Sequence, residues 1–442
     1  MYLTVALKSC HRGGSLTPFY ASLLAGVIVV LVACQTVLAQ PAPAKPSDRP
    51  KAPGAAPAPA APAAPAEAAP KPEPKYDEDP TEETPAMKKL RVEVLKILKG
   101  GRVSGGDQDV LDQYYRKFAL PRWTQGKYIP KITDFRKDLR SELSVAKGQA
   151  HDYLNALTLE YINKLLAGRY HPGVQVNAML MIGDLNAEEQ GPVPLPAALE
   201  VLIAAVGNEK LSDGLRAAAM VGILRDATLG IEDAETRRSV MAAMLKLVAA
   251  ADPPGNPATV APTPSRQWIC RRAIDTLGRF GAVGENNAVF NAILKTVADA
   301  KLSLYTRSTA AESLGRLNYT GVTGINAVEA AATLGQFVID ACNDELQRVK
   351  AKPDIDLSLL RRWIRQHLLA ASTALTGADE SHKGILTQLK EGEQRAFGDA
   401  LQKAVKEKSD LLDDPKTPDD DLTPQVEELK KTLDSWLQKK PK

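Results

Sequence analysis

The residues that could carry out chemistry are few and widely separated in this sequence of 442 residues. The five histidines are His11, His151, His171, His367 and His382. None of them lies near another histidine or a cysteine at the spacing of a metal site. His367 follows Trp363 by one helical turn, which is more typical of core packing with a polar edge than of a ligand site. The acidic run 184–189 lacks the central glycine and terminal glutamate of a calcium loop. We therefore predict no metal site.

Motifs for catalysis or cofactor binding are also missing from the sequence. The glycines between Gly100 and Gly106 indicate a flexible loop, but the Gly-Lys-Ser/Thr step of a phosphate-binding loop does not follow them. There is no G-x-S-x-G nucleophile elbow. Two acidic pairs, Asp107 with Asp109 and Asp354 with Asp356, stand at expected helix starts, where carboxylates favour the helix dipole. We predict no catalytic residue and no cofactor, and therefore a protein that is not an enzyme.

Cysteine usage does not indicate a disulfide scaffold. Cys10 and Cys34 lie near the N-terminus, and the sequence contains no CxxC motif. Cys270 and Cys342 fall in separate expected helices. They could pair if the protein is exported, but we expect two small buried thiols.

The charge is nearly balanced, with a formal net charge of +3 and interspersed acidic and basic residues. No basic stripe interleaved with aromatic residues is present, which excludes a nucleic-acid partner. Aromatic residues make up only 5% of the chain, while alanine and leucine dominate its centre. Such side chains lose little rotamer freedom in a helix, so this composition favours helix-on-helix packing.

A short sequence pattern that occurs four times predicts the helices of the central part of the chain. Each copy has an alanine followed by a small or apolar residue, two variable positions and an aliphatic–glycine step. The copies begin at Ala178, Ala217, Ala273 and Ala310 and end at Gly183, Gly222, Gly278 and Gly315. Because these positions share one helical face, each copy predicts the buried stripe of a helix. A repeat of about 40 residues predicts a stack of helix pairs.

The expected fold class is all-α, an α-solenoid of about five helix pairs over residues 149–378. The expected pairs are His151–Leu166 with Val174–Leu185, Leu195–Val206 with Leu215–Leu224, Arg237–Ala250 with Trp268–Phe280, Ala288–Ala300 with Tyr305–Leu317, and Val328–Lys350 with Leu357–Leu375. A proline-rich insertion, Asp252–Ser265, separates the helices of the third pair. The fifth pair has Thr376 where the glycine would stand, a change typical of the end of a stack.

The second helices resemble those of the HEAT-repeat family. From Arg307 to Gly315, the fourth copy resembles the R-x-x-A-A-x-x-L-G second helix of that family. In the second and third copies the arginine stands at Arg216 and Arg272, and the first copy has Asn177 instead. The resemblance implies a scaffold that binds proteins along a concave surface. One branch of the family resembles lyases that attach bilin pigments, which implies an alternative function as a ligand-processing enzyme or lyase but no site residues.

Five arginines in the second helices and their turns are the candidate partner-binding residues: Arg216, Arg271, Arg272, Arg307 and Arg316. Arginines in such a row either bind the turn of the next repeat or recognise a ligand. In the second case the row would bind an acidic protein segment. The acidic tail of the chain itself, Asp410–Asp421, could then occupy it. The sequence does not identify the protein partner.

Helical caps are expected on both sides of the repeat array, over residues 86–148 and 379–409. The N-terminal cap contains expected helices at Ala86–Leu98, at Asp107–Leu120 and from Thr133, and an aromatic cluster of Trp123, Tyr128 and Phe135. A small recognition domain is the alternative for this region. Residues 410–442 comprise an acidic linker and an amphipathic helix, Val426–Leu437. That helix would dock on the array or bind a partner.

An apolar run over residues 20–39 is long enough to span a bilayer, and it follows a basic stub, residues 1–19, that should stay cytoplasmic. The run is an uncleaved transmembrane anchor, a signal peptide cleaved after Ala39, or a lipobox that leads to acylation of Cys34. All three place the rest of the chain in the cell envelope, either anchored to the membrane or periplasmic.

Residues 40–85 predict a disordered stalk, because proline and alanine dominate a tract that cannot form a core. Its end, Tyr76–Thr84, is acidic and expected to be solvated. Together these features predict a non-catalytic protein–protein interaction scaffold of the bacterial cell envelope. It would attach to the membrane through its N-terminal segment and need no small-molecule cofactor.

Overall fold

The computed structural model describes residues 75–250, 262–352, 354–418 and 421–441. The expected stub 1–19, the apolar run 20–39 and most of the stalk lie outside these residues, as does most of the insertion Asp252–Ser265. Within the described part of the chain, no helix is long and apolar enough to cross a membrane.

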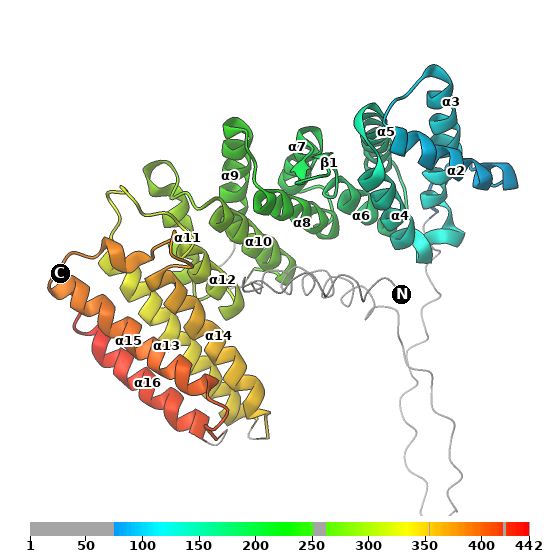
Figure 1. Cartoon of the computed structure of the whole chain (residues 1–442). Coiled ribbons are helices and arrows are strands. Elements are labelled where there is room, and N and C mark those ends of the chain that lie inside the picture. Colours follow the sequence, from blue (N-terminus) through cyan, green and yellow to red (C-terminus); the bar gives the residue numbers. More distant parts are fainter. Residues whose placement is uncertain (1–74, 251–261, 353, 419–420, 442) are drawn as a thin grey trace, which may run out of the picture. The chain divides into compact units, whose positions relative to one another are not determined.

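The described residues fold almost entirely into helices, so the prediction of an all-α fold is confirmed (Figure 1). The N-terminal group comprises α2 (Pro85–Gly100), α3 (Gly105–Tyr114), η1 (Tyr115–Ala119), η2 (Pro121–Thr124), η3 (Gly126–Lys131) and α4 (Ile132–Val145). The central group comprises α5 (Gly148–Ala167), α6 (Pro172–Ile182), α7 (Pro196–Gly207), α8 (Asp213–Leu229), α9 (Ala234–Ala249), α10 (Pro264–Phe280), η4 (Glu285–Asn287), α11 (Ala288–Ala298), α12 (Leu304–Leu314), α13 (Ala327–Ala351) and α14 (Leu357–Thr376). The C-terminal group comprises η5 (Ile385–Gln388), α15 (Glu393–Asp413) and α16 (Leu422–Leu437).

A short hairpin interrupts the helices after α6. Its strands, β1 (Asn186–Glu188) and β2 (Val193–Pro194), pair antiparallel. The sequence does not predict this hairpin, because two strands of such length have no alternating apolar pattern.

The ten helices from α5 to α14 pack as consecutive pairs. The two helices of each pair contact each other, from α5 with α6 to α13 with α14. Each second helix also contacts the next second helix, in the order α6, α8, α10, α12 and α14. The first helices α7, α9, α11 and α13 contact one another in the same order. The core of this region therefore lies between two series of helices.

Polar caps determine where the second helices begin. The side-chain oxygens of Ser212, Thr263 and Ser303 each accept a hydrogen bond from the backbone N–H three residues later, at the starts of α8, α10 and α12. Asp356 plays the same part for α14, where it accepts from the N–H of Ser358. Each cap satisfies an N–H group that has no partner within its helix.

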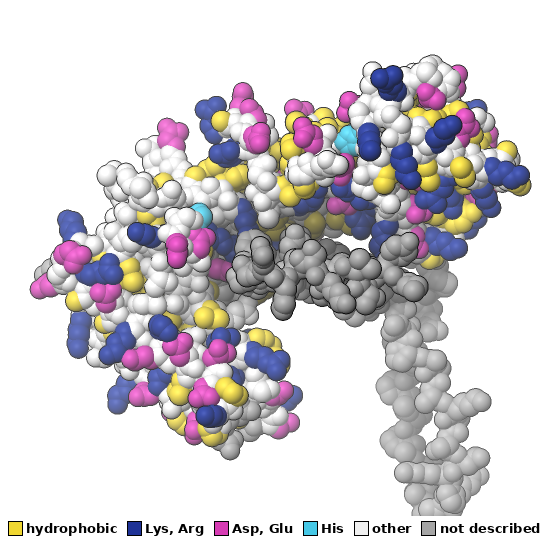
Figure 2. Space-filling model, in the orientation of Figure 1, with side chains coloured by type: hydrophobic (Ala, Val, Ile, Leu, Met, Phe, Trp, Pro, Cys, Tyr) yellow, Lys and Arg dark blue, Asp and Glu magenta, His cyan; other side chains and the backbone are white. Residues whose placement is uncertain are grey.

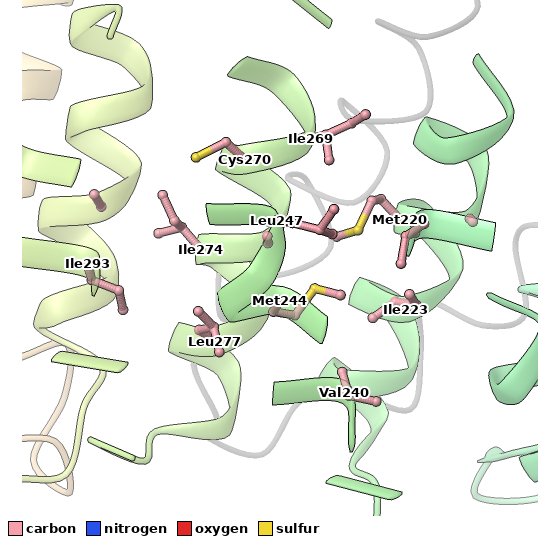
Figure 3. Packing of buried hydrophobic residues seen from close by; sticks show 14 of the residues in the cluster. Met220, Ile223, Val240, Met244, Leu247, Ile269, Cys270, Ile274, Leu277 and Ile293 are labelled. Atoms are coloured by element: carbon pink, nitrogen blue, oxygen red, sulfur yellow. The ribbon is translucent and has the colours of Figure 1, made fainter. Parts of the chain in front are cut away.

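Aliphatic side chains fill the space between neighbouring pairs. In Figure 3, Met220 and Ile223 of α8 face Met244 of α9, and Ile274 and Leu277 of α10 lie beside them. All five are buried. Because burial of a side chain of this size contributes ~1.5–3 kcal/mol, this continuous apolar layer is the main stabilising feature of the helix pairs.

The glycines of the repeated pattern lie where second helices approach most closely. A Cβ atom on Gly183, the C-cap of α6, would lie 2.6 Å from the Cα of Gly222 in α8, and one on Gly222 would lie 2.7 Å from the Cα of Gly183. On α10, a Cβ on Gly278 would lie 2.9 Å from the Cβ of Ser313 in α12. Gly315, which ends α12, similarly faces the carbonyl oxygen of Thr373 in α14. Backbone proximity therefore explains why small residues recur at these positions.

The second copy of the pattern is out of phase with the others, which corrects its predicted buried stripe. Ala217 and Val221 are only half-buried, whereas Ala219, Met220 and Ile223 are fully buried. Gly222 lies ten residues after the N-cap of its helix, Ser212, whereas Gly183 and Gly315 lie twelve residues after His171 and Ser303. Aligning the copies by their glycines therefore misplaces the buried face of this helix.

Most of the acidic segment Tyr76–Thr84 is exposed, as expected for a solvated end of the stalk, but Asp79 within it is buried against α5. The buried carboxylate of Asp79 accepts hydrogen bonds from the hydroxyls of Tyr161 at 2.6 Å and Tyr170 at 2.8 Å. The ammonium group of Lys164 lies 2.8 Å from the same carboxylate. These three donors offset the desolvation of the charged group, which composition alone does not reveal.

The C-terminal helix α16 docks on α13 and α15, which is one of the two outcomes expected for it. Its Trp436 ring stacks on Phe397 of α15 with centroids 4.0 Å apart, and its Nε1–H donates to the carbonyl oxygen of Phe397 at 2.9 Å. The same indole lies against Gly335 of α13. Helix α15 extends to Asp413, so the predicted start of the acidic linker at residue 410 is wrong. Leu412 is buried and holds this last turn in place.

The close crossing of α6 and α8 gives a stability prediction. Gly222→Ala should destabilise the full-length chain by ~1–3 kcal/mol, because the added methyl group meets the backbone of Gly183. Gly214→Ala, on the same helix, is the matched control, since a Cβ there has only ordinary contacts. It should leave stability unchanged or raise it slightly through helix propensity. Equal unfolding midpoints for the two variants in urea would show that the crossing tolerates a side chain.

Candidate functional site

Two of the five candidate arginines, Arg216 and Arg307, are buried and occupy the same position in their helix pairs. The Nε–H of each donates to the carbonyl oxygen ten residues earlier, at 3.1 Å and 2.7 Å respectively. Gln175 makes the same contact through Nε2 at 3.2 Å. The acceptors are the carbonyls of Leu165, Val206 and Val297. They lie in the last turn of each first helix, where carbonyls have no partner within the helix.

Of the other three candidates, Arg272 and Arg316 meet at Asp275 where α10 contacts α12, and Arg271 lies over Tyr305 at the start of α12. The carboxylate of Asp275 accepts a hydrogen bond from the guanidinium group of Arg316 at 2.7 Å and lies 3.6 Å from that of Arg272. The guanidinium group of Arg271 lies over the exposed ring of Tyr305, 4.1 Å from its centroid. Sequence reasoning did not single out Asp275, because a single aspartate within a helix has no distinguishing pattern.

The acidic tail is held by arginines outside this row. Arg365 of α14 lies 2.8 Å from Asp413, and Arg361 donates to the carbonyl oxygen of Thr417 at 2.6 Å. Asp410 pairs with Lys406 of its own helix at 2.6 Å. The described part of the tail therefore lies against α14.

The aromatic cluster of the cap surrounds a cation. The guanidinium group of Arg122 lies 4.3 Å from the ring centroid of Phe135 and 5.0 Å from that of Tyr128. Trp123 is buried beside it, and a pocket of about 310 Å³ opens among these residues. Cation–π contacts of this kind stabilise the packing of the cap.

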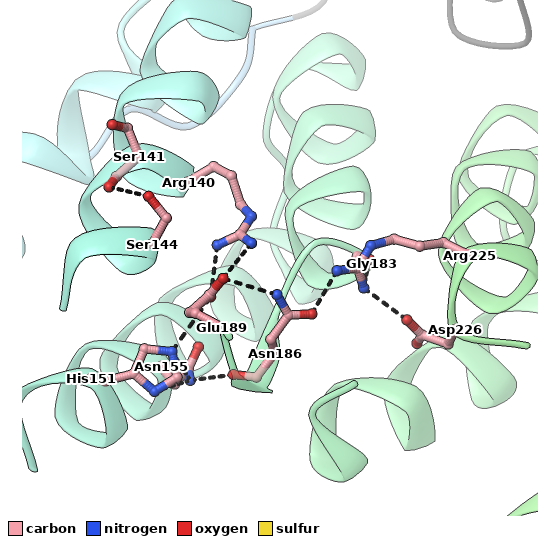
Figure 4. A network of polar contacts seen from close by, with 10 residues as sticks. All are labelled: Arg140, Ser141, Ser144, His151, Asn155, Gly183, Asn186, Glu189, Arg225 and Asp226. Atoms are coloured by element: carbon pink, nitrogen blue, oxygen red, sulfur yellow. Dashed lines mark hydrogen bonds and ion pairs between the residues drawn. The ribbon is translucent and has the colours of Figure 1, made fainter. Parts of the chain in front are cut away.

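A network of polar side chains joins α4, α5 and α8 to the hairpin (Figure 4). At its centre, Glu189 accepts two hydrogen bonds from Arg140 of α4, at 2.7 Å and 2.6 Å. Asn186 of β1 donates to the same carboxylate at 3.1 Å, and its backbone carbonyl accepts from Asn155 of α5 at 2.8 Å. His151 of α5 lies 3.5 Å from Glu189. Side chains of α4 and α5 thus bind the hairpin segment.

Arg225 of α8 completes the network. It donates to the side-chain oxygen of Asn186 at 2.5 Å, to the carbonyl of Gly183 at 3.2 Å and to Asp226 at 2.9 Å. Nearby, Arg136 of α4 lies 3.2 Å from Asp184. The segment 184–189 therefore uses its oxygens to accept from arginine and asparagine side chains.

Burial perturbs the acids of this network. Desolvation raises the pKa of Asp226 to about 7, against the opposing attraction of Arg225, and repulsion from Asp184 adds to the rise. Burial likewise raises the pKa of Asp184, although Arg136, Arg225 and Arg140 oppose it. An acid that titrates near neutral pH could donate a proton. The carboxylate of Asp226, however, is already engaged by Arg225, which favours a structural role.

A second group of titratable residues lines a groove of about 890 Å³ formed by α12, α13 and α14. Glu345 and His367 are buried in it, and burial raises the pKa of Glu345 to about 7 and lowers that of His367 to about 4. The Nδ1 atom of His367 lies 2.5 Å from Oγ of Ser308. Trp363 lines the same groove. Sequence reasoning found the Trp363–His367 pair but missed Glu345, whose local sequence is typical of a solvated helix.

Cys270 and Cys342 are free and buried, as expected. Burial raises the pKa of each thiol to about 12, so neither forms a reactive thiolate at neutral pH. Among the residues that the structure describes, no group of three or more His, Cys, Asp or Glu side chains is arranged to hold a metal ion.

The surface charge is mixed. Figure 2 shows Lys or Arg and Asp or Glu side chains next to one another over the C-terminal helices. Pairs such as Arg395 with Asp399 at 2.9 Å and Lys430 with Asp434 at 2.6 Å account for part of this pattern. Such exposed pairs contribute ~0–1 kcal/mol each and create no strong field of one sign. Comparison with known proteins gives no family, because no family model and no curated protein matches this sequence.

Asp226 should make stability depend on pH. Its pKa is about 7 in the folded chain against 3.8 for an unperturbed group, so folding takes up a proton between these values. The free energy of unfolding should therefore fall as pH rises from about 4 to about 7. Asp226→Asn has no carboxyl group to titrate at this position. As pH rises over that range, its free energy of unfolding should therefore increase by a few kcal/mol relative to that of wild type, at about 1.4 kcal/mol per pKa unit.

Urea unfolding of the full-length chain at a series of pH values measures this effect. Asp109→Asn, at an exposed aspartate of α3, is the control and should follow the wild-type pH profile. If the Asp226→Asn profile also runs parallel to wild type, the buried carboxylate does not titrate in this range.

Proposed function

We propose that the protein is a non-catalytic protein–protein interaction scaffold of the bacterial cell envelope, built on an α-solenoid of HEAT-like helix pairs. The main support is the recurrence of one packing rule from α5 to α14, in which each second helix contacts the next. In stacked repeats each pair contacts mainly its neighbours, and the array presents an extended row of residues. Such a surface suits an extended protein segment better than an enclosed small substrate.

The polar clusters support a scaffold more than an enzyme. A catalytic acid or base needs a reacting group within hydrogen-bond reach. In the network of the hairpin, that position is taken by Arg225 for Asp226 and by Arg140 for Glu189. The pair of Arg140 with Glu189 and the hydrogen bonds of Arg225 to Gly183 and Asn186 join α4 and α8 to the hairpin segment, which suits a rigid framework.

Among the five candidate arginines, we propose that those near Asp275 form the partner-binding site. Arg272 and Arg316 contact Asp275 there, and Arg271 of the same helix face lies over the exposed ring of Tyr305. Arg216 and Arg307 support this site indirectly, because they bind the ends of first helices. We propose that the three clustered arginines contact an acidic stretch of a protein partner.

The envelope location rests on the N-terminal sequence. The apolar run over residues 20–39, preceded by basic residues, would export the chain and hold it at the membrane. The proline- and alanine-rich tract that follows would act as a spacer. An anchor, a cleaved signal peptide and acylation of Cys34 all remain compatible with this proposal.

A reporter fusion tests the location. Alkaline phosphatase fused after Lys75 should be active, because that enzyme folds only after export. A reporter that works only in the cytoplasm, fused at the same residue, should be inactive. The opposite pattern would rule out an exported body.

Affinity capture from the native membrane fraction tests the partner site. With full-length protein as bait, Arg271→Gln should weaken partner binding by ~1 kcal/mol or more, about fivefold. Lys403→Gln on α15 removes an exposed positive charge elsewhere and should bind as wild type does. Equal capture by both variants, with unchanged thermal stability, would exclude Arg271 from the interface.

A further inference from the structure

The groove between the start of α12, the C-terminal half of α13 and α14 has walls of mixed character. Its volume is about 890 Å³. Tyr305, with half of its surface exposed, lies at its edge, and Trp363 and His367 line it from α14. Asp344 and Glu345 line it from α13. The groove is therefore large enough for a side chain with part of its backbone.

Most charges in the groove neutralise one another. Arg307 lies 2.7 Å from Asp340, and Arg348 lies 2.7 Å from Asp344. His367 is uncharged near neutral pH, because burial lowers its pKa to about 4. These pairings leave the carboxyl group of Glu345 as the unbalanced group of the site.

Glu345 is buried without the contacts that buried carboxylates normally have. The residue is only 4% exposed, and its Oε2 atom has no hydrogen-bond partner. Burial raises its pKa to about 7, which Arg348 opposes and Asp344 reinforces. An unpartnered buried polar atom is costly, and such atoms are rare in folded proteins. A donor from outside the chain would remove this cost.

We propose that this groove receives a lysine or arginine side chain of the protein partner, with Glu345 as its counter-charge. This inference rests on the proposed scaffold function and names the chemistry that one of its sites recognises. A cationic side chain supplies both the missing hydrogen-bond donor and the missing charge. An anionic ligand would face Asp340, Asp344 and Glu345 and is disfavoured.

The aromatic wall fits the same ligand. The guanidinium group of Arg348 already lies over Trp363, 5.1 Å from the ring centroid, and that of Arg271 lies over Tyr305 at 4.1 Å. These contacts show that cationic groups pack well on this wall. The aliphatic stem of a bound lysine or arginine would lie against the exposed part of Tyr305 while its charged end reaches Glu345.

Selection from a random library of displayed peptides on the full-length chain tests the inference. Enriched peptides should carry lysine or arginine at one fixed position. Replacement of that residue, arginine by citrulline or lysine by norleucine, should weaken binding to wild type by about tenfold or more, as for a close interfacial charge pair. Glu345→Gln should weaken binding of the original peptide by a similar factor. In that variant the peptide replacement should have little further effect, because the pair is already broken.

The matched control is Glu391→Gln, at an exposed glutamate before α15, which should bind the peptides as wild type does. Thermal unfolding of Glu345→Gln shows whether the variant is folded, and binding of the uncharged peptide gives the same check. Peptides without a fixed basic residue, or equal binding of the basic peptide by wild type and Glu345→Gln, would overturn the inference. In either case capture of a membrane partner by both proteins would leave the scaffold proposal standing. If wild type binds neither the peptides nor a membrane partner, the groove inference and the scaffold proposal are both overturned.

Discussion

The close approach of backbones between successive second helices is the constraint on which the repeat region depends. At Gly183 and Gly222 two helices meet with no room for a side chain, and Gly278 meets the small Ser313 in the same way. Helices that touch at backbone distance present their flanking side chains to each other at a fixed offset. The aliphatic layer of Figure 3 can then interlock without gaps. A bulky residue at a crossing would separate the pair and open that layer.

The same spacing places the end of each first helix beside the second helix of its pair. Arg216 and Arg307 bind those ends, and Gln175 does so without a charge. The common requirement is therefore a long donor rather than a positive charge. This explains why the position is not always arginine, and why a row of arginines indicates partner binding less directly than its charge suggests. Hydrogen bonds to carbonyls leave no trace in residue type, so sequence alone could not separate the two roles.

Strongly periodic segments could be predicted from the sequence, and features created by tertiary contacts could not. The second helices occur where the alanine–glycine pattern places them, since that pattern is the packing surface itself. The predicted buried face of α8 is wrong because Gly222 lies two residues nearer the N-cap of its helix than Gly183 and Gly315 do. The burial of Asp79 could not be predicted, because its three donors come from residues distant in the sequence. The polar network around Glu189 was missed for the same reason.

Glu345 extends this argument to the groove. Helix α13 has 25 residues whereas α11 has 11, and the C-terminal half of the longer helix contributes Asp340, Asp344, Glu345 and Arg348 to the groove. In sequence these residues resemble an exposed helical face with paired charges. In the fold, Asp344 and Arg348 do pair, but Glu345 is buried in the wall of the groove. Burial of an unbalanced acid lowers stability in the free protein. An unpartnered buried acid is a feature expected where a protein binds a ligand or a partner. Among the helix pairs from α5 to α14, the pair α13–α14 is therefore the one in which a side chain serves something other than packing.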